Sequence, residues 1–120
     1  MALAHSPQTV TDGLVLALDA GNTKSYPGSG TTWSDLSGKG NDGTLVNSPT
    51  YSNLNGGNFN FDEVNDYVNI GSTVINGTAY TKIAWIRPES ACRNIISSSS
   101  SDGHVMWMSA TDHTLYAGHN

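Results

Sequence analysis

The chain consists of short runs in which apolar and polar residues alternate, separated by turns rich in Gly, Asn and Pro. In residues 13–19, for example, Leu14, Leu16 and Leu18 share one face of an extended segment, as in a strand that covers a core. Helix-forming composition is lacking, because Glu occurs only twice and runs of Ala, Glu, Lys and Leu at helical spacing do not occur. The pattern predicts an all-β fold of antiparallel strands and excludes helical bundles.

Further runs of the same kind predict the remaining strands. They lie at residues 44–46, 58–62, 67–70, 80–87, 93–98, 104–109 and 114–117. The second and third of these are separated by a short polar turn and are expected to form a hairpin, as are the fifth and sixth. The fourth is apolar on both sides, with Ile83 and Trp85 on one face, which predicts a central strand. Residues 24–41 are expected to form a long loop pinned by Trp33 and Leu36.

The charge and the cysteine content of the chain limit the kinds of partner and the cellular location that can be expected. The net charge is −5 and there are five basic residues, too few for the positive surface that phosphate binding needs, so no nucleic-acid partner is expected. No apolar run is long enough to span a membrane, and the first residues lack the basic start and apolar core of a signal peptide. We therefore expect synthesis in a cytoplasm without export or membrane insertion. Cys92 is the single cysteine and cannot form an internal disulfide.

Three longer stretches carry a resemblance. They are DGLVLALDAGN at residues 12–22, WSDLSGKGNDGTL at 33–45 and NFNFDEVNDYV at 58–68. In this order they resemble the opening half of laminin-G-like, concanavalin A-like lectin/glucanase domains. The sequence of residues 24–33 is similar to versions found in structural and fibre proteins of marine tailed bacteriophages.

The resemblance implies a jelly-roll β-sandwich, with residues 1–12 as an N-terminal arm and residues 13–120 as the N-terminal portion of the sandwich. Strands that the family has after residues 115–118 are absent from the sequence. Such a sandwich is incomplete and would be completed by a partner chain or by further C-terminal strands, since open edges and uncovered apolar faces attract other chains. The family also commonly has Gly where this chain has Glu63, so either the turn differs or Glu63 is strained.

The function implied by the resemblance is that of a non-enzymatic virion protein, a fibre, decoration or other head or tail component located on the particle. It would act through assembly contacts with other virion proteins or with itself as a homo-oligomer. The alternative is a carbohydrate-binding module for a host surface glycan, for which Trp33, Tyr26 and Tyr51 would supply aromatic faces; ordinary packing is the competing interpretation. A polysaccharide hydrolase is disfavoured, because Glu63 and Glu89 do not form the carboxylate array of the glucanases.

Other motifs point to turns. Residues 38–43 match the G-x-G-x-x-G pattern of a dinucleotide-binding loop, but no strand is predicted before them and no helix after them. No cofactor is expected. Calcium is the alternative left open, with Asp62, Asn65 and Asp66 in one turn and Asp35 as a further oxygen ligand if the loops meet. The same residue types are preferred in tight turns without any metal.

Overall fold

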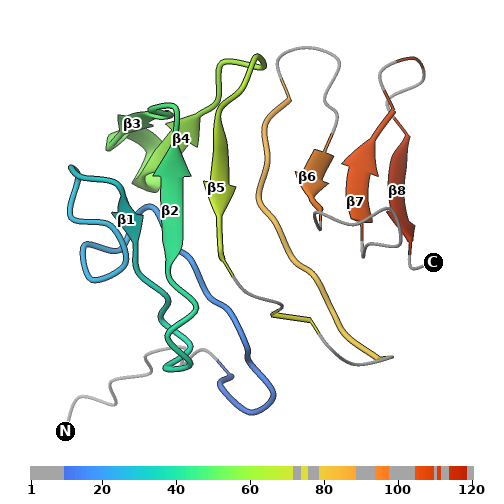
Figure 1. Cartoon of the computed structure of the whole chain (residues 1–120), viewed down its shortest axis with the longest axis horizontal. Helices are drawn as coiled ribbons and strands as arrows, with labels where there is room; N and C mark the ends of the chain where they lie inside the picture. Colours follow the sequence, from blue (N-terminus) through green and yellow to red (C-terminus); the bar gives the residue numbers. More distant parts are fainter. Residues whose placement is uncertain are drawn as a thin grey trace, which may run out of the picture. The chain divides into compact units, whose positions relative to one another are not determined.

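A computed structural model describes residues 10–71, 74–75, 79–88, 94–97, 105–109, 111 and 114–118 (Figure 1). Its strands are β1 (Thr32–Trp33), β2 (Gly43–Val46), β3 (Thr50–Ser52), β4 (Asn58–Asn60), β5 (Tyr67–Asn69), β6 (Asn94–Ile96), β7 (Val105–Met108) and β8 (Leu115–Gly118). A short 3-10 helix, η1 (Leu54–Gly56), lies between β3 and β4. All strand pairs are antiparallel, which confirms the predicted fold class. The chain divides into two compact units, Met1–Asn76 and Gly77–Asn120, which are described separately.

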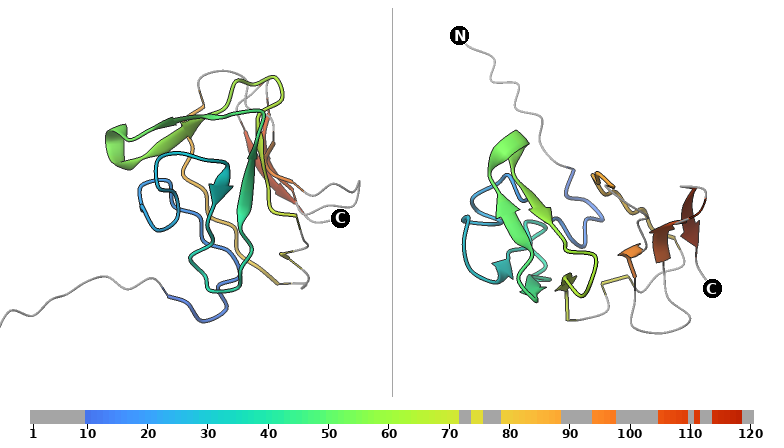
Figure 2. Two further views of the ribbon diagram at one scale, coloured as in Figure 1. Left: turned by 60° about the vertical axis from the view of Figure 1, so that its left-hand side comes forward. Right: turned by 90° about the horizontal axis from the view of Figure 1, so that it is seen from above.

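The first unit contains two small sheets, of order β1-β2-β5 and β3-β4 (Figures 1 and 2). The predicted hairpin between residues 58–62 and 67–70 is therefore wrong, because β4 pairs with β3 whereas β5 pairs with β2. The turn between them carries the chain from one sheet to the other. Turn residues specify a change of direction but not which strand the chain meets next, so local sequence signals do not distinguish these outcomes.

Aliphatic side chains pack around β2 in this unit. Leu45 is buried, with 7% of its surface exposed, and it pairs in register with Val68 of β5. Gly43 is buried on the same side of the strand. A Cβ added there would lie 2.7 Å from a methyl carbon of Val68 and 3.5 Å from one of Leu18, so only glycine fits without a shift. This packing explains why the chain has glycine in the middle of an apolar face.

Residues 14–19 run beside this core without joining a ladder among the described strands. Leu14, Leu16 and Leu18 are half-buried, as their alternation predicts, but the expected strand pairing is not found. Ala17 bonds to the following loop instead: its carbonyl accepts a hydrogen bond of 2.8 Å from the amide of Leu36, and its amide donates to Asp35 Oδ1 at 2.9 Å. The loop thus satisfies backbone groups that a neighbouring strand would otherwise satisfy.

The described strands of the second unit form a sheet of order β6-β7-β8. The predicted hairpin of residues 93–98 with 104–109 is confirmed by the pairing of β6 with β7, and the predicted strand at 114–117 is confirmed as β8. The β6–β7 register shifts between Asn94 and Ile96, whereas the β7–β8 register is regular throughout. The two edges of this sheet are therefore unlike each other.

Residues 80–87 do not form the central strand predicted for them. No strand is formed within this segment, and the side chains of Ile83 and Trp85 are 80% and 98% exposed. The opposite side carries Lys82, whose ammonium lies 5.3 Å from the centroid of the Tyr80 ring. Burial of that ammonium lowers the pKa of Lys82. Alternation identifies which side chains share a face, but not whether anything covers that face.

Candidate functional site

The first unit gathers aromatic side chains from its loop and strands into one cluster. Phe59 of β4 lies at its centre, with ring centroids 4.8 Å from Tyr26, 4.7 Å from Trp33 and 5.4 Å from Tyr51. Tyr26 and Tyr51 are 4.9 Å apart, and all four pairs are tilted or edge-to-face, the geometry that aromatic pairs prefer. The cluster thus brings together the three residues predicted for carbohydrate binding. Phe59 was predicted only as a strand residue and not as part of a site.

The tyrosine hydroxyls of the cluster brace loops. The Tyr26 hydroxyl donates to the Gly30 carbonyl at 2.9 Å, and the Tyr51 hydroxyl donates to the Ala20 carbonyl at 3.2 Å. Tyr26 is 4% exposed, so its ring packs and does not present a face for stacking. Beside it, Ser25 is fully buried and its hydroxyl donates to the Ser34 carbonyl at 2.6 Å. Residues 24–41, predicted as a loop, contain the short strand β1, and Ser25 and Tyr26 hold this segment together with Trp33. Leu36, which was expected to pin it as well, is 36% exposed.

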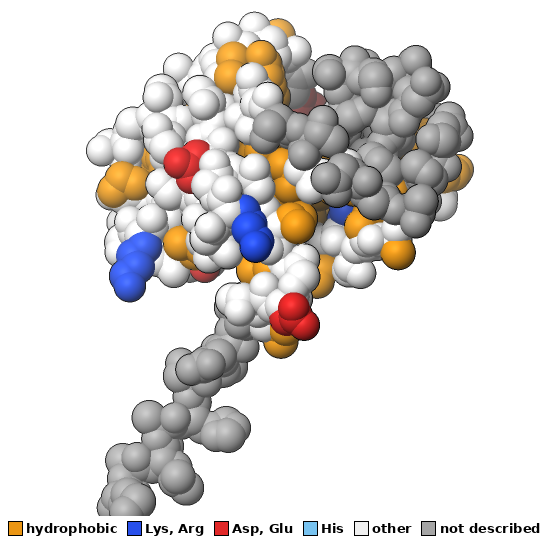
Figure 3. Space-filling view, turned by 60° about the horizontal axis from the view of Figure 1, so that its bottom comes forward, with side chains coloured by type: hydrophobic (Ala, Val, Ile, Leu, Met, Phe, Trp, Pro, Cys, Tyr) orange, Lys and Arg blue, Asp and Glu red, His pale blue; other side chains and the backbone are white. Residues whose placement is uncertain are grey.

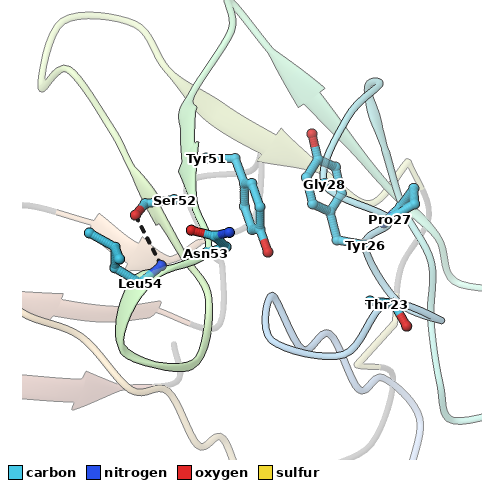
Figure 4. A pocket seen from close by; sticks show the side chains of 8 residues that line it. All are labelled: Thr23, Tyr26, Pro27, Gly28, Tyr51, Ser52, Asn53 and Leu54. Atoms are coloured by element: carbon cyan, nitrogen blue, oxygen red, sulfur yellow. Dashed lines mark hydrogen bonds between the residues drawn. The ribbon is translucent and has the colours of Figure 1, made fainter.

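A shallow depression of about 650 Å³ lies beside the two tyrosines (Figure 4). Its lining is uncharged and consists of Thr23, Tyr26, Pro27, Gly28, Tyr51, Ser52, Asn53 and Leu54. Ser52 Oγ accepts a hydrogen bond of 3.2 Å from the Leu54 amide, while the Asn53 side chain makes no capping bond to η1. Aromatic carbon, hydroxyls and an amide without formal charge suit a neutral polar ligand. Ser52, Asn53 and Leu54 form the rim of the depression after Tyr51, and the only sequence feature that could have indicated them is the polar turn at this place.

Trp33 does not line this depression. It packs on Phe59, and its indole Nε1 is buried without a hydrogen-bond partner among the described residues. An indole N–H usually finds a partner when it is buried. The geometry therefore gives Trp33 a packing role, and its part in sugar binding stays a prediction.

Asp35 organises the loop that follows β1. Its Oδ1 accepts the amides of Ala17 and Ser37, each at 2.9 Å. Its Oδ2 accepts the Ser37 hydroxyl at 2.6 Å and the Asn41 amide at 3.0 Å. Burial, the largest single influence, raises the pKa of this carboxyl, but the hydrogen bonds together outweigh it and lower the pKa from 3.8 to about 2. Both carboxylate oxygens thus serve loop structure.

Asp62 has a comparable role in the turn between β4 and β5. Its Oδ1 accepts the amides of Val64 at 2.9 Å, Asn65 at 3.2 Å and Asp66 at 3.3 Å, and these bonds, led by that of Val64, lower the pKa of Asp62. Asp66 Oδ2 accepts the amide of Asp62 at 3.1 Å. Within the described ranges, no three His, Cys, Asp or Glu side chains form a group that could hold a metal ion. The calcium site built on these residues and Asp35 stays a prediction.

Glu63 occupies the turn position where the resembling family has glycine, and its φ is +64°. This left-handed conformation agrees with the strain expected at Glu63, and the comparison with the turn of the family stays a prediction. Such a conformation costs about 1–2 kcal/mol for an ordinary residue. Glu89, the other glutamate of the chain, lies outside the described residues, as do Cys92 and all the histidines.

Two glycines allow the loops behind the depression to touch. A Cβ on Gly57 would lie 2.5 Å from the Ala20 carbonyl oxygen and 2.6 Å from the Cα of Gly21, and a Cβ on Gly21 would collide with the Gly56 carbonyl. Backbone therefore rests on backbone where the turn at residues 19–22 meets the β3–β4 turn. The same Ala20 carbonyl accepts the Tyr51 hydroxyl, so this contact positions one wall of the depression.

In the part of the chain that the structure describes, no helix has the length and apolar character of a membrane span. Comparison of the chain with family models, with curated proteins and with solved structures gave no match.

Proposed function

We propose that the chain is a non-enzymatic structural protein that works through apolar assembly contacts, and that it is a fibre, decoration or other head or tail component of a virion. The virion part of this proposal rests on the resemblance of residues 12–68. The assembly part rests on large apolar side chains that the second unit leaves uncovered. Ile83 is 80% exposed, Trp85 98%, Leu115 51% and Tyr116 42%.

This exposure favours association for energetic reasons. Covering an aliphatic or Phe-sized side chain is worth about 1.5–3 kcal/mol, and aromatic side chains dominate the energetics of interfaces. Figure 3 shows one face of the molecule, on which separate charged side chains lie among uncharged ones. Only 12% of the residues of the chain are charged, so little repulsion opposes contact between copies. An assembly held in this way should resist salt, because apolar burial is not screened by ions.

Native mass spectrometry and size-exclusion chromatography at low and high salt test the proposal. We expect one defined oligomer that persists in high salt, and a smaller oligomeric fraction for Trp85→Ser. Val64→Ser is the matched control, because Val64 is 81% exposed in a turn of the first unit and should leave the oligomer unchanged. A stable monomer under both salt conditions would overturn the assembly role.

A second candidate function is binding of a neutral glycan in the depression. It is favoured by the meeting of the half-buried Tyr51 with uncharged polar residues at one place. Because Tyr26 is buried, its removal would disturb the fold, so Asn53→Ala is the better variant. We expect it to reduce retention on a neutral polysaccharide without changing the melting temperature, whereas Asn60→Ala, exposed on β4, should retain binding. Equal retention by both variants would count against this site.

A further inference from the structure

Strand β8 has a ladder partner on one side only among the described strands, since the sheet order is β6-β7-β8. The opposite edge, β6, is irregular, because its register shifts between Asn94 and Ile96. Irregular edges resist pairing, whereas regular edges without charge or proline invite it. β8 is regular over Leu115–Gly118 and contains neither a charged residue nor proline. Among the described strands of this sheet, β8 therefore presents the unprotected edge.

One observed hydrogen bond determines which backbone groups of β8 point toward β7 and which point away from it. The amide of Ser109 donates to the Thr114 carbonyl at 2.9 Å, so these two residues form a hydrogen-bonded pair at the start of the β7–β8 ladder. Such pairs alternate along antiparallel strands, which makes Trp107 and Tyr116 the next one. The amide and carbonyl groups of Leu115 and Ala117 consequently point away from β7, toward the open edge.

These outward groups are symmetric about Tyr116, and we infer that β8 pairs with β8 of a second copy of this chain in an antiparallel, two-fold arrangement. Leu115 of each copy would pair with Ala117 of the other, which gives about four backbone hydrogen bonds. The two Tyr116 residues would face each other at the axis as a non-hydrogen-bonded pair, with Cα atoms about 4.5 Å apart. A single sheet would then run through both copies.

Side chains support a second copy as the occupant. Trp107 and Tyr116 are stacked, with centroids 4.5 Å apart and planes at 12°, and they remain 37% and 42% exposed. Across the axis this stack would continue into the same pair of the other copy, forming one row of aromatic rings. Neither β7 nor β8 carries a charge, so two identical edges do not repel each other. The added aromatic area matters, because a stable interface buries about 1,200–2,000 Å², more than a short edge supplies alone.

This inference rests on the proposed assembly function and specifies one of its contacts. Cysteine substitution tests it in the full chain with Cys92→Ser as background. Tyr116→Cys should form a covalent dimer under mild oxidation, because the paired Cα atoms lie within disulfide range. Leu115→Cys is the matched control: its two copies would lie beyond that range, so we expect about tenfold less covalent dimer.

Proline substitution gives an independent measurement. Ala117→Pro removes an amide that points to the open edge, a position where strands tolerate proline, so the sheet should keep its circular dichroism while the mass falls to that of the monomer. Tyr116→Pro removes an amide bonded to β7 and should instead disrupt the sheet. If the unmodified chain is oligomeric but Tyr116→Cys fails to cross-link and folded Ala117→Pro keeps its mass, the β8 contact is refuted while the assembly role stands. A monomeric unmodified chain refutes both.

Discussion

Replacing Asp35 by Asn tests the view that this carboxylate holds the loop after β1. The amide side chain can still accept the bonds made by Oδ1, but its NH₂ group faces the Asn41 amide, a donor, in place of Oδ2. A pKa lowered from 3.8 to about 2 sets an upper bound of about 2.4 kcal/mol on the stability gained from ionisation. Because the carboxyl is partly in contact with solvent, screening reduces this to about 1 kcal/mol.

The pH dependence has a defined sign. The folded-state pKa of Asp35 lies below the unfolded-state value, so the stabilisation is fully present above about pH 4 and is lost as the pH falls toward 2. Urea denaturation followed by circular dichroism should give Asp35→Asn a lower free energy of unfolding at pH 7, by about 1 kcal/mol. The difference from the unmodified chain should shrink between pH 4 and pH 2. Asp62, whose pKa is also lowered, is common to both proteins and cancels in the comparison.

Asp12→Asn serves as the control, because Asp12 is exposed and its substitution should change the free energy of unfolding by less than about 0.5 kcal/mol. The reasoning is refuted if Asp35→Asn is as stable as the unmodified chain at pH 7. It is equally refuted if the difference persists unchanged down to pH 2.

Three further substitutions test the backbone and the cluster by thermal or urea unfolding. Glu63→Gly should raise the free energy of unfolding by about 0.5 kcal/mol, because the relief of backbone strain at φ +64° exceeds the entropy cost of glycine. Val64→Gly, outside the left-handed region, should lower the free energy of unfolding by about 0.5–1 kcal/mol. Loss of stability in both variants would contradict the backbone strain at Glu63. Gly57→Ala should cost at least about 2 kcal/mol, since its Cβ would lie 2.5 Å from the Ala20 carbonyl at φ +88°, and a neutral effect would show that the loops do not touch. Tyr51→Phe should cost about 0.5–1.5 kcal/mol through loss of its bond to Ala20, and an unchanged melting curve would argue against that brace.

Alternation and turn residues predicted the fold class and most strand positions, because both are local properties of the chain. The partner of a strand is not local. The turn at residues 62–66 looks like a hairpin in sequence, yet it connects β4 and β5 of different sheets. Likewise, residues 14–19 have the alternation of a strand, but Asp35 and Leu36 take the backbone bonds that a neighbouring strand would have made.

The candidate site was predictable to a similar degree. The carbohydrate-binding alternative grouped Tyr26, Trp33 and Tyr51 as aromatic residues in or beside loops, and the structure brings them together around Phe59. Which of these side chains pack inside the unit and which line the depression depends on their burial, and no local sequence pattern encodes burial. Ser25 carried no signal at all, because a serine in a polar loop is ordinary until its burial is known.

The glycine contact between the turns at residues 19–22 and 55–57 has a practical consequence for grafting foreign peptides into this chain. With no side chains between the two backbones, neither turn has room for an inserted sequence. The loop around Lys39 is different, since Lys39 is exposed and the space beside Gly38 and Gly40 is open, although both glycines must be kept because their φ values are +79° and +75°. Peptide display should therefore succeed at Lys39, and insertion after Gly56 should yield a chain that does not fold.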